Sequence, residues 1–232
     1  MNEANSHLLE MEIEENNIFK LTNQKFEIEL ALFKKGFERC AETALLIYKE
    51  VKRNDVTYSI LSSFMIMPRL FISMKSILNL VLKGYYYDAS ILVRSWMECI
   101  GLWIYLSKNE DEARNWTMMK PINVSYIKLM EEFSYVWKDG KNKRFYPVYA
   151  QLSRYIHNLS TAIYKILKEG KVYDDHIEMI APFSPSFNEK EAYETLFLSL
   201  PFFFWTTLNE VFSLNQYDEI VEYAKDVLPT LR

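Results

Sequence analysis

The chain has 232 residues, half of them hydrophobic, and 27 basic side chains stand against 31 acidic ones. The formal charge of −4 gives no general attraction to nucleic acid or anionic lipid, so such contacts would need a local patch. Five glycines and seven prolines are few for tight turns, which favours long helices over a many-stranded sheet. Cys40 and Cys99 lie in apolar helical patterns, which fits reduced thiols in a cytoplasmic protein. No linker or repeat divides the chain, so we expect a single domain over residues 1–232.

The N-terminal residues 1–22 are polar and acid-rich and lack the pattern of a secretory signal. Leu8, Leu9, Met11 and Ile13 predict a short helix that docks or frays, so this segment could be mobile. The longest hydrophobic run, 196–205, contains Ser199 and Pro201 and is shorter than the roughly 20 residues that a membrane span needs. We therefore expect no membrane contact.

Two strongly periodic helices follow, over about residues 24–53 and 60–81. Apolar residues recur in both at alternating steps of four and three, the spacing of helices that pack nearly parallel or antiparallel. Asn54-Asp55 supplies a short connection and an N-cap candidate, so the two helices should form a heptad-packed antiparallel hairpin. Pro68 should kink the second helix.

The central helix is expected over 85–107, after Gly84 ends the helix before it. It is apolar on nearly all sides, as in the middle of a bundle. Its polar and small residues share one narrow stripe, which comprises Tyr87, Ser90, Arg94, Glu98, Gly101 and Tyr105.

The remaining chain predicts further helices, a surface loop and no repeat. Helices are expected at 109–116, 124–137, from Arg144 or Tyr146 to 168, at 188–214 with a break or bend at Pro201, and at 218–228, with the loop at 171–187. The fold class is therefore all-α, an up-and-down bundle of about seven to eight helices.

Familiar cofactor and metal motifs are missing from the sequence, which contains neither a P-loop nor G-x-G-x-x-G. Three histidines make a multi-histidine metal site improbable, and no Glu-x-x-His pair of a dimetal bundle occurs. Asp174-Asp175-His176 with Glu178 is better interpreted as a solvated loop than as a cation site. We expect no metal and no cofactor.

Arg94 and Glu98 form the first candidate site, one helical turn apart in an otherwise apolar helix. They could serve a site inside the bundle or form a structural ion pair. The order with arginine first is the less favourable one for pairing within a helix, so each side chain is expected to reach across the bundle.

The second candidate lies in residues 137–157, where cations alternate with aromatic residues. Cations attract phosphate and rings stack on bases, so Lys141, Lys143, Arg144 and Tyr149 could bind RNA. A basic loop followed by core aromatics gives the same pattern. Arg154 and His157 share a helix face and could combine charge stabilisation with proton transfer, or His157 could be a hydrogen-bonded core residue.

A resemblance to known proteins rests on three short motifs within residues 60–165. They are Gly-x-x-x-Asp-Ala at Gly84, Arg-x-x-x-Glu at Arg94, and Leu-Ser-x-x-x-His at Leu152. This combination resembles an all-helical bacterial family without an assigned function and, more distantly, the HEPN domains, many of which are ribonucleases of toxin and antiphage systems. The resemblance implies RNA as substrate and metal-independent cleavage at a dimer interface. The Arg-x4-6-His motif of HEPN nucleases does not occur here.

Two functional hypotheses follow from these observations. In the first, the protein acts on RNA in a bacterial defence or toxin-type system. Arg94 and Arg154 would hold phosphate, and His157 would transfer the proton. Glu98 would orient one of these three side chains. In the second, it is a non-enzymatic interaction module whose helical faces bind a protein partner or a second copy, and Arg94, Glu98 and His157 form a buried structural network.

Overall fold

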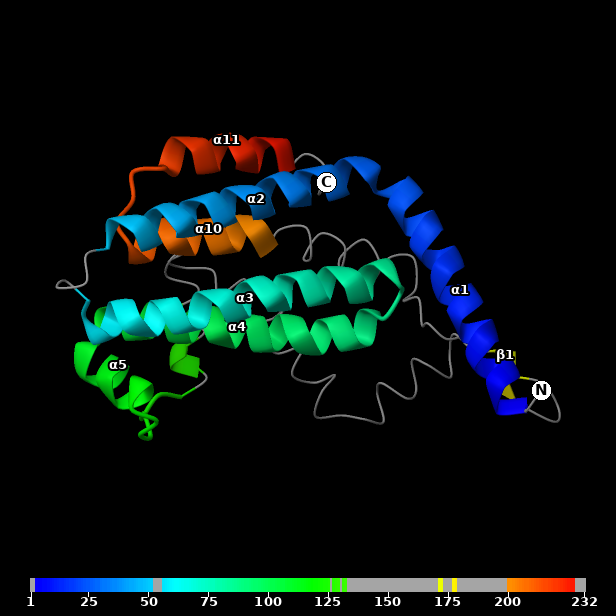
Figure 1. The fold of residues 1–232 in the computed structure, drawn as a ribbon, viewed down its shortest axis with the longest axis horizontal. Coiled ribbons are helices and arrows are strands. Elements are labelled where there is room, and N and C mark those ends of the chain that lie inside the picture. The colour runs from blue at the N-terminus through cyan, green and yellow to red at the C-terminus, as the bar shows by residue number, and fades with distance from the viewer. Residues whose placement is uncertain are drawn as a thin grey trace.

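The computed structural model describes residues 3–51, 56–125, 127–129, 131–132, 171–172, 177–178 and 200–227. This part is all-α, as predicted, apart from one hairpin of two-residue strands (Figure 1). Its elements are α1 (Glu3–Lys25), α2 (Glu27–Glu50), α3 (Tyr58–Leu82), α4 (Tyr86–Lys108), α5 (Glu110–Thr117), β1 (Lys171–Val172), β2 (Ile177–Glu178), α10 (Leu200–Val211) and α11 (Tyr217–Val227).

The antiparallel pair of α3 and α4 is the most closely packed pair of helices in the described part of the chain. A tight turn joins the two helices, and Gly84 has the positive φ of 85° that this turn requires. The amide of Gly84 donates to Val81 O, and that of Tyr85 donates to Leu80 O, which is the Schellman pattern. The predicted end of the helix at Gly84 is therefore confirmed.

A second layer of helices covers this pair, formed by α2, α10 and α11 (Figure 1). α10 runs parallel to α2, and α11 returns antiparallel along it, where Tyr223 donates its hydroxyl to Leu32 O at 2.9 Å. Gly36 permits this close approach, because a Cβ there would lie 2.1 Å from the Tyr223 hydroxyl. Elements far apart in sequence thus close one side of the bundle.

Aromatic side chains fill the space between the two layers. Trp103 and Phe204 are almost fully buried, and their ring centroids lie 5.6 Å apart. Trp103 also donates its indole N–H to the Ser63 hydroxyl at 2.8 Å, which satisfies a buried polar group. α2 and α3 contact each other through aromatic side chains: the rings of Phe37 and Phe71 pack edge-to-face, with centroids 5.3 Å apart. The predicted α2–α3 hairpin partners therefore touch through side chains, whereas the closest backbone approach is between α3 and α4.

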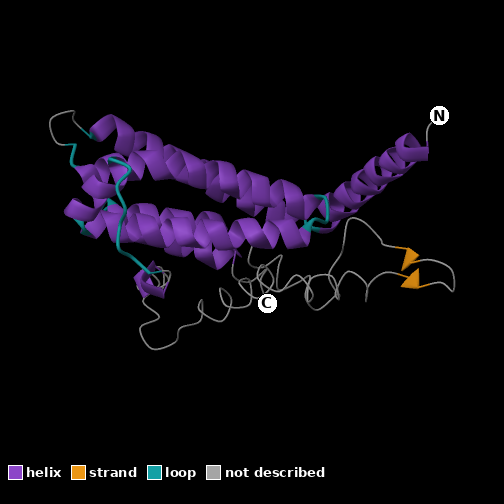
Figure 2. Ribbon diagram, turned by 90° about the horizontal axis from the view of Figure 1, so that it is seen from below, coloured by secondary structure: helices purple, strands orange, loops and turns teal. Residues whose placement is uncertain are grey.

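The N-terminal helix α1 is longer than the short helix expected from the sequence. It is nearly continuous with α2, and the two are separated at Phe26, whose φ of −117° and ψ of 32° lie outside the helical region. Beyond the end of α3 and α4, the first half of α1 extends away from the bundle (Figure 2).

Two helices are long and apolar enough, by length and composition, to cross a membrane: α3 and the part of α4 from Asp88 to Lys108. The prediction from uninterrupted apolar runs missed them, because isolated polar residues break each run without lowering its average hydropathy much. Both helices pack in the bundle, and 39% and 56% of their most apolar windows are buried. Buried core helices have the same composition.

Several predicted boundaries need correction. The N-cap of α3 is Thr57, whose hydroxyl accepts from the amide of Ile60, and not the Asn54-Asp55 pair, which lies outside the described residues. Asn109 occupies the N-cap position of α5, but its side-chain amide donates a hydrogen bond to Tyr105 O in the last turn of α4. The strands β1 and β2 pair antiparallel inside the segment predicted as a loop. Of the helix predicted at 124–137, the described residues 127–129 and 131–132 are helical, and the helix predicted from Arg144 or Tyr146 to 168 lies outside the described residues.

Candidate functional site

Arg94 and Glu98 form an ion pair within α4, with Arg94 Nε 3.0 Å from Glu98 Oε1. The structural ion pair that the sequence left open is therefore present, although the arginine-first order is the less favourable one within a helix. The orientation preference amounts to only a few tenths of a kcal/mol, which the surroundings of a packed helix easily exceed. Their side chains retain 15% and 22% of their exposure, whereas Val93 and Met97 beside them are buried. The pair is thus partly open to solvent.

Ser90 and Gly101 of the predicted stripe are used for packing. Ser90 is buried and donates its hydroxyl to Tyr86 O at 2.7 Å, one turn back in the same helix. A Cβ at Gly101 would lie 2.3 Å from Leu129 O, so this glycine lets the chain after α5 approach the backbone of α4. Beyond it, Glu132 accepts a hydrogen bond from Lys108 at 2.7 Å. The C-terminal end of the stripe is therefore an interface and not an open groove.

The other predicted site residues lie outside the described residues. They are the proposed catalytic Arg154 and His157 and the proposed RNA-binding Lys141, Lys143, Arg144 and Tyr149. The structure brings Arg94 and Glu98 together and leaves their predicted convergence with His157 as a prediction.

The cysteines and acidic residues give no candidate metal site: within the described ranges, no cluster contains three or more potential His, Cys, Asp or Glu ligands. Cys40 is fully buried and donates to Pro201 O at 3.2 Å. Burial raises the pKa of the Cys40 thiol well above its ordinary value and also raises that of the half-buried Cys99, where the charge of Arg69 opposes the shift. Both cysteines therefore stay protonated at neutral pH.

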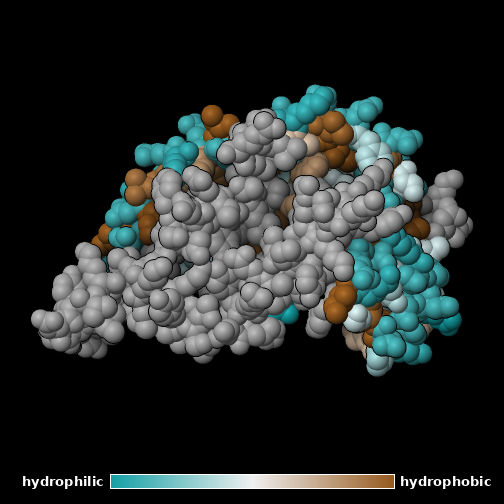
Figure 3. All heavy atoms as spheres, turned by 180° about the vertical axis from the view of Figure 1, so that it is seen from behind, coloured by the Kyte–Doolittle hydropathy of each residue, from teal (hydrophilic) through white to brown (hydrophobic). Residues whose placement is uncertain are grey.

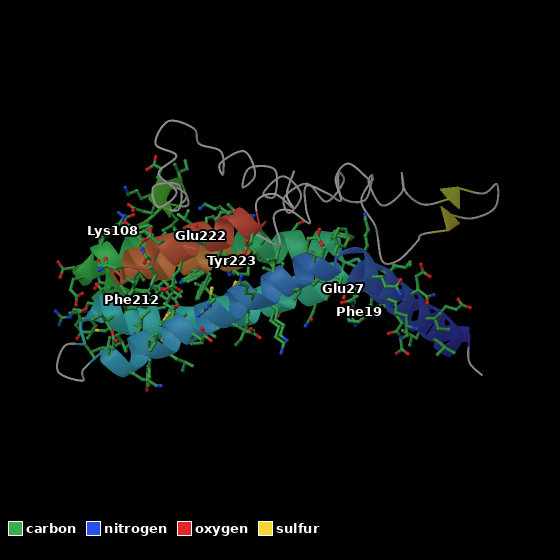
Figure 4. The ribbon with its side chains drawn as sticks, turned by 90° about the horizontal axis from the view of Figure 1, so that it is seen from above. Phe19, Glu27, Lys108, Phe212, Glu222 and Tyr223 are labelled. Carbon is green, nitrogen blue, oxygen red and sulfur yellow. The ribbon has the colours of Figure 1, made fainter. Side chains whose placement is uncertain are left out.

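A cleft of about 320 Å³ lies at the end of the bundle where α3 begins and α5 follows α4. Glu110 dominates its chemistry: it accepts from the amides of Tyr58 and Ser59 and from the Ser59 hydroxyl at 2.6 Å. These bonds, first of all the one from the Ser59 hydroxyl, lower the pKa of Glu110. Lys108 and Phe212 lie at this end of the molecule (Figure 4) and line the cleft with Thr57, Ser59, Ile60, Ser63, Ser107, Glu110 and Val211.

This cleft was not predicted from the sequence. In the sequence, Glu110 lies in an acidic first turn of α5, a position that is favourable to α5 itself and does not point to another helix. Its carboxylate instead occupies the start of α3, where helix amides would otherwise attract an anion. The position is therefore filled by the protein's own side chain and works as a helix cap.

A surface of a different kind runs along α3, and we call it the α3 face. Its apolar members Leu61, Met65 and Ile72 are between 39% and 67% exposed, and they recur at the spacing of one helix side. The complete α3 face comprises Leu61, Met65, Pro68, Arg69, Ile72 and Lys75, all of them exposed. Large side chains in such a row are typical of a face that another element covers.

The first half of α1, residues 3–14, also exposes apolar side chains, and we call it the α1 arm. Leu8, Leu9, Met11 and Ile13 are between 42% and 61% exposed. In Figure 3, hydrophobic and hydrophilic residues mix along the edge where α1 slopes down from α2. The arm is the largest extension from the described bundle.

Next to the arm, Glu15 attaches α1 to the α3–α4 turn. Its carboxylate accepts hydrogen bonds from the Tyr85 hydroxyl and from Lys83 Nζ, the latter at 2.9 Å. These bonds, first that of Tyr85 and then that of Lys83, lower the pKa of Glu15. The same carboxylate raises the pKa of Tyr85 to about 12. The attachment point fixes where the arm leaves the bundle.

The described part of the chain is thus all-α apart from the β1–β2 hairpin, and it is built around the α3–α4 pair and the helices that cover it. Comparisons with protein-family models, curated proteins and solved structures find no match to it.

Proposed function

We propose that this protein is a non-enzymatic helical interaction module that associates with itself through the α3 face. The exposure of Leu61, Met65 and Ile72 along one side of α3 is the observation that carries the proposal. Burying such side chains contributes roughly 25 cal/mol for each Å² of apolar surface removed from water. Positions 61, 65, 68 and 72 follow the anchor spacing by which helices occupy grooves on their partners.

The neighbouring helix widens this surface. Tyr48 of α2 is exposed at its edge but rests on Phe64 of α3, with ring centroids 5.5 Å apart. Phe37 and Phe71 make the next ring contact along the same boundary. A partner seated on the α3 face would therefore lie beside aromatic side chains that the bundle already holds in place, so little side-chain entropy would be lost on binding.

The test is the molar mass of the full chain, measured by light scattering over a range of concentrations. The wild type should form a dimer or larger species, and the double variant Met65→Glu with Ile72→Glu should be monomeric at the same thermal midpoint. Leu46→Glu is the matched control, because Leu46 is 51% exposed on α2 and lies outside the α3 face. A wild type that stays monomeric at every concentration would contradict the proposal.

We also propose a second candidate function, the binding or cleavage of RNA by a cytoplasmic protein of a bacterial defence or toxin-type system. The partial exposure of the Arg94 and Glu98 side chains, next to the buried Val93 and Met97, favours it. It also rests on the sequence resemblance to the helical bacterial family and to HEPN domains. Arg154 and His157 would complete the catalytic group, with Lys141, Lys143, Arg144 and Tyr149 gathering the substrate.

Incubation with total RNA tests this second function. His157→Ala should abolish cleavage with little change in the thermal midpoint, and Arg94→Ala should weaken RNA binding. Arg39→Ala is the control for the loss of one cation, since Arg39 pairs with Glu42 on the exposed side of α2. If the wild type neither binds nor cleaves RNA, this function is wrong, and the interaction module is unaffected.

A further inference from the structure

We propose that the α1 arm of one copy lies along the α3 face of a second copy, and that the exchange is reciprocal. This inference rests on the proposed self-association and specifies which surfaces meet. The contact would join an acidic helix that exposes several apolar side chains to a basic helical face that also exposes apolar side chains. In a two-fold dimer it would occur twice, with each copy giving its arm and receiving one.

The α1 arm needs a cover that the described bundle does not give it. Leu9 and Ile13 are about half exposed, although they lie one turn apart and could anchor a contact together. An isolated helix of this length is only marginally stable in water, and helices in proteins gain most of their stability from packing. A continuous helix at this position is therefore best explained by a partner surface.

The charges of the two surfaces are complementary. α1 contains five glutamates, Glu3, Glu10, Glu12, Glu14 and Glu15, against two lysines, Lys20 and Lys25. α3 contains no acidic residue, and its two cations, Arg69 and Lys75, are both exposed on the α3 face. Opposite charges of this kind speed association and fix the register of a contact. A face-to-face contact between two α3 helices would instead bring cations together.

The position and length of the α1 arm allow it to contact another molecule. Glu15 is bound to Lys83 and Tyr85 at the turn after α3, so residues 3–14 lie beyond that end of the bundle. At about 1.5 Å per residue, these 12 residues extend about 18 Å, the same length as the stretch from Leu61 to Ile72. The arm is thus long enough to cover the α3 face of a neighbour.

Charge reversal can test the pairing directly in the full-length protein. The arm variant carries Glu12→Lys and Glu14→Lys, and the face variant carries Arg69→Glu and Lys75→Glu; all four positions are exposed. Each variant alone would place like charges together at both contacts, and we expect its dissociation constant to rise about tenfold or more. Mixed in equal amounts, the two variants should form a heterodimer, because both of its contacts again join opposite charges.

The mass of each variant and of the mixture, measured by light scattering, decides between the outcomes. Recovery of the dimer in the mixture, and in the variant with all four substitutions, supports the exchanged arm. If Met65→Glu with Ile72→Glu dissociates the dimer but the mixture does not re-form it, another surface covers the α3 face and only the exchanged arm is refuted. A dimer unaffected by any reversal also overturns this inference, while a monomeric wild type overturns the proposed function as well.

Discussion

Glu110 caps the start of α3 by accepting both the amide and the hydroxyl of Ser59, at 3.1 and 2.6 Å. The two residues are 51 positions apart and belong to different helices. The bond therefore ties the first turn of α5 to the first turn of α3, and one carboxylate satisfies amides that α3 cannot pair internally.

Removing this cap should destabilise the fold. We expect Glu110→Ala to lower the free energy of unfolding by about 0.5–2 kcal/mol, the range measured for lost helix caps. Asp111→Ala is the matched control, because Asp111 also lies in the acidic first turn of α5 and is exposed. Urea denaturation of both variants provides the measurement, and equal losses would show that the α5 dipole, and not the cap, is responsible.

The attachment of α1 through Glu15 should depend on pH. Because the folded-state pKa of Glu15 is lowered, its stabilisation is complete above the ordinary carboxyl pKa and is lost as the pH falls through the lowered value. At pH 7 we expect Glu15→Gln to cost up to about 1 kcal/mol, since the carboxylate is partly exposed. The difference between wild type and variant should disappear in acid, and a difference that grows there would contradict this assignment.

Met119 should be a site where glycine stabilises the protein. It is 92% exposed and adopts a φ of 56°, and the amides of Met119 and Lys120 close the Schellman pattern after α5. The left-handed region costs a side-chain-bearing residue about 1 kcal/mol, so Met119→Gly should raise the free energy of unfolding by about 0.5–1 kcal/mol. Met118→Gly, whose φ is −88°, should instead be neutral or destabilising in the same thermal melts.

Gly101 should tolerate no side chain. Helix propensity alone predicts that Gly101→Ala stabilises α4 by about 1 kcal/mol. The added Cβ would meet the backbone carbonyl of Leu129, which cannot rotate away as a side chain can, so we expect a loss of about 1–3 kcal/mol instead. The sign of the change in denaturant midpoint distinguishes the two outcomes.

The helices could be predicted wherever a strong apolar period coincided with a local stop signal. α3 and α4 follow this rule, and Gly84 marks the turn between them through its own backbone geometry. α1 was underestimated because its apolar residues do not gather on one side, so its period is weak. Its length is supported instead by continuity with α2 and by the contact of Glu15 with the α3–α4 turn.

The candidate site was less predictable, since its geometry depends on contacts distant in sequence. Arg94 and Glu98 were correctly singled out as polar residues in an apolar helix, but their pairing depends on small energy differences that spacing does not resolve. Glu110 escaped notice because its target lies in another helix. The α3 face was missed because the exposed side of a mostly apolar helix has the same residue types as its buried side.

The Cys40 thiol is buried between α2 and α10 against Pro201 O, so its chemical reactivity can report on the separation of these helices. A thiol-reactive dye can modify this sulfur only after the two helices separate, so the rate of labelling counts their openings. Cys99 is less deeply buried and should be labelled first, so labelling should occur in a fast and a slow step. The rate of the slow step would report how often α2 and α10 separate, although the residues that join them lie more than 150 positions apart in the chain.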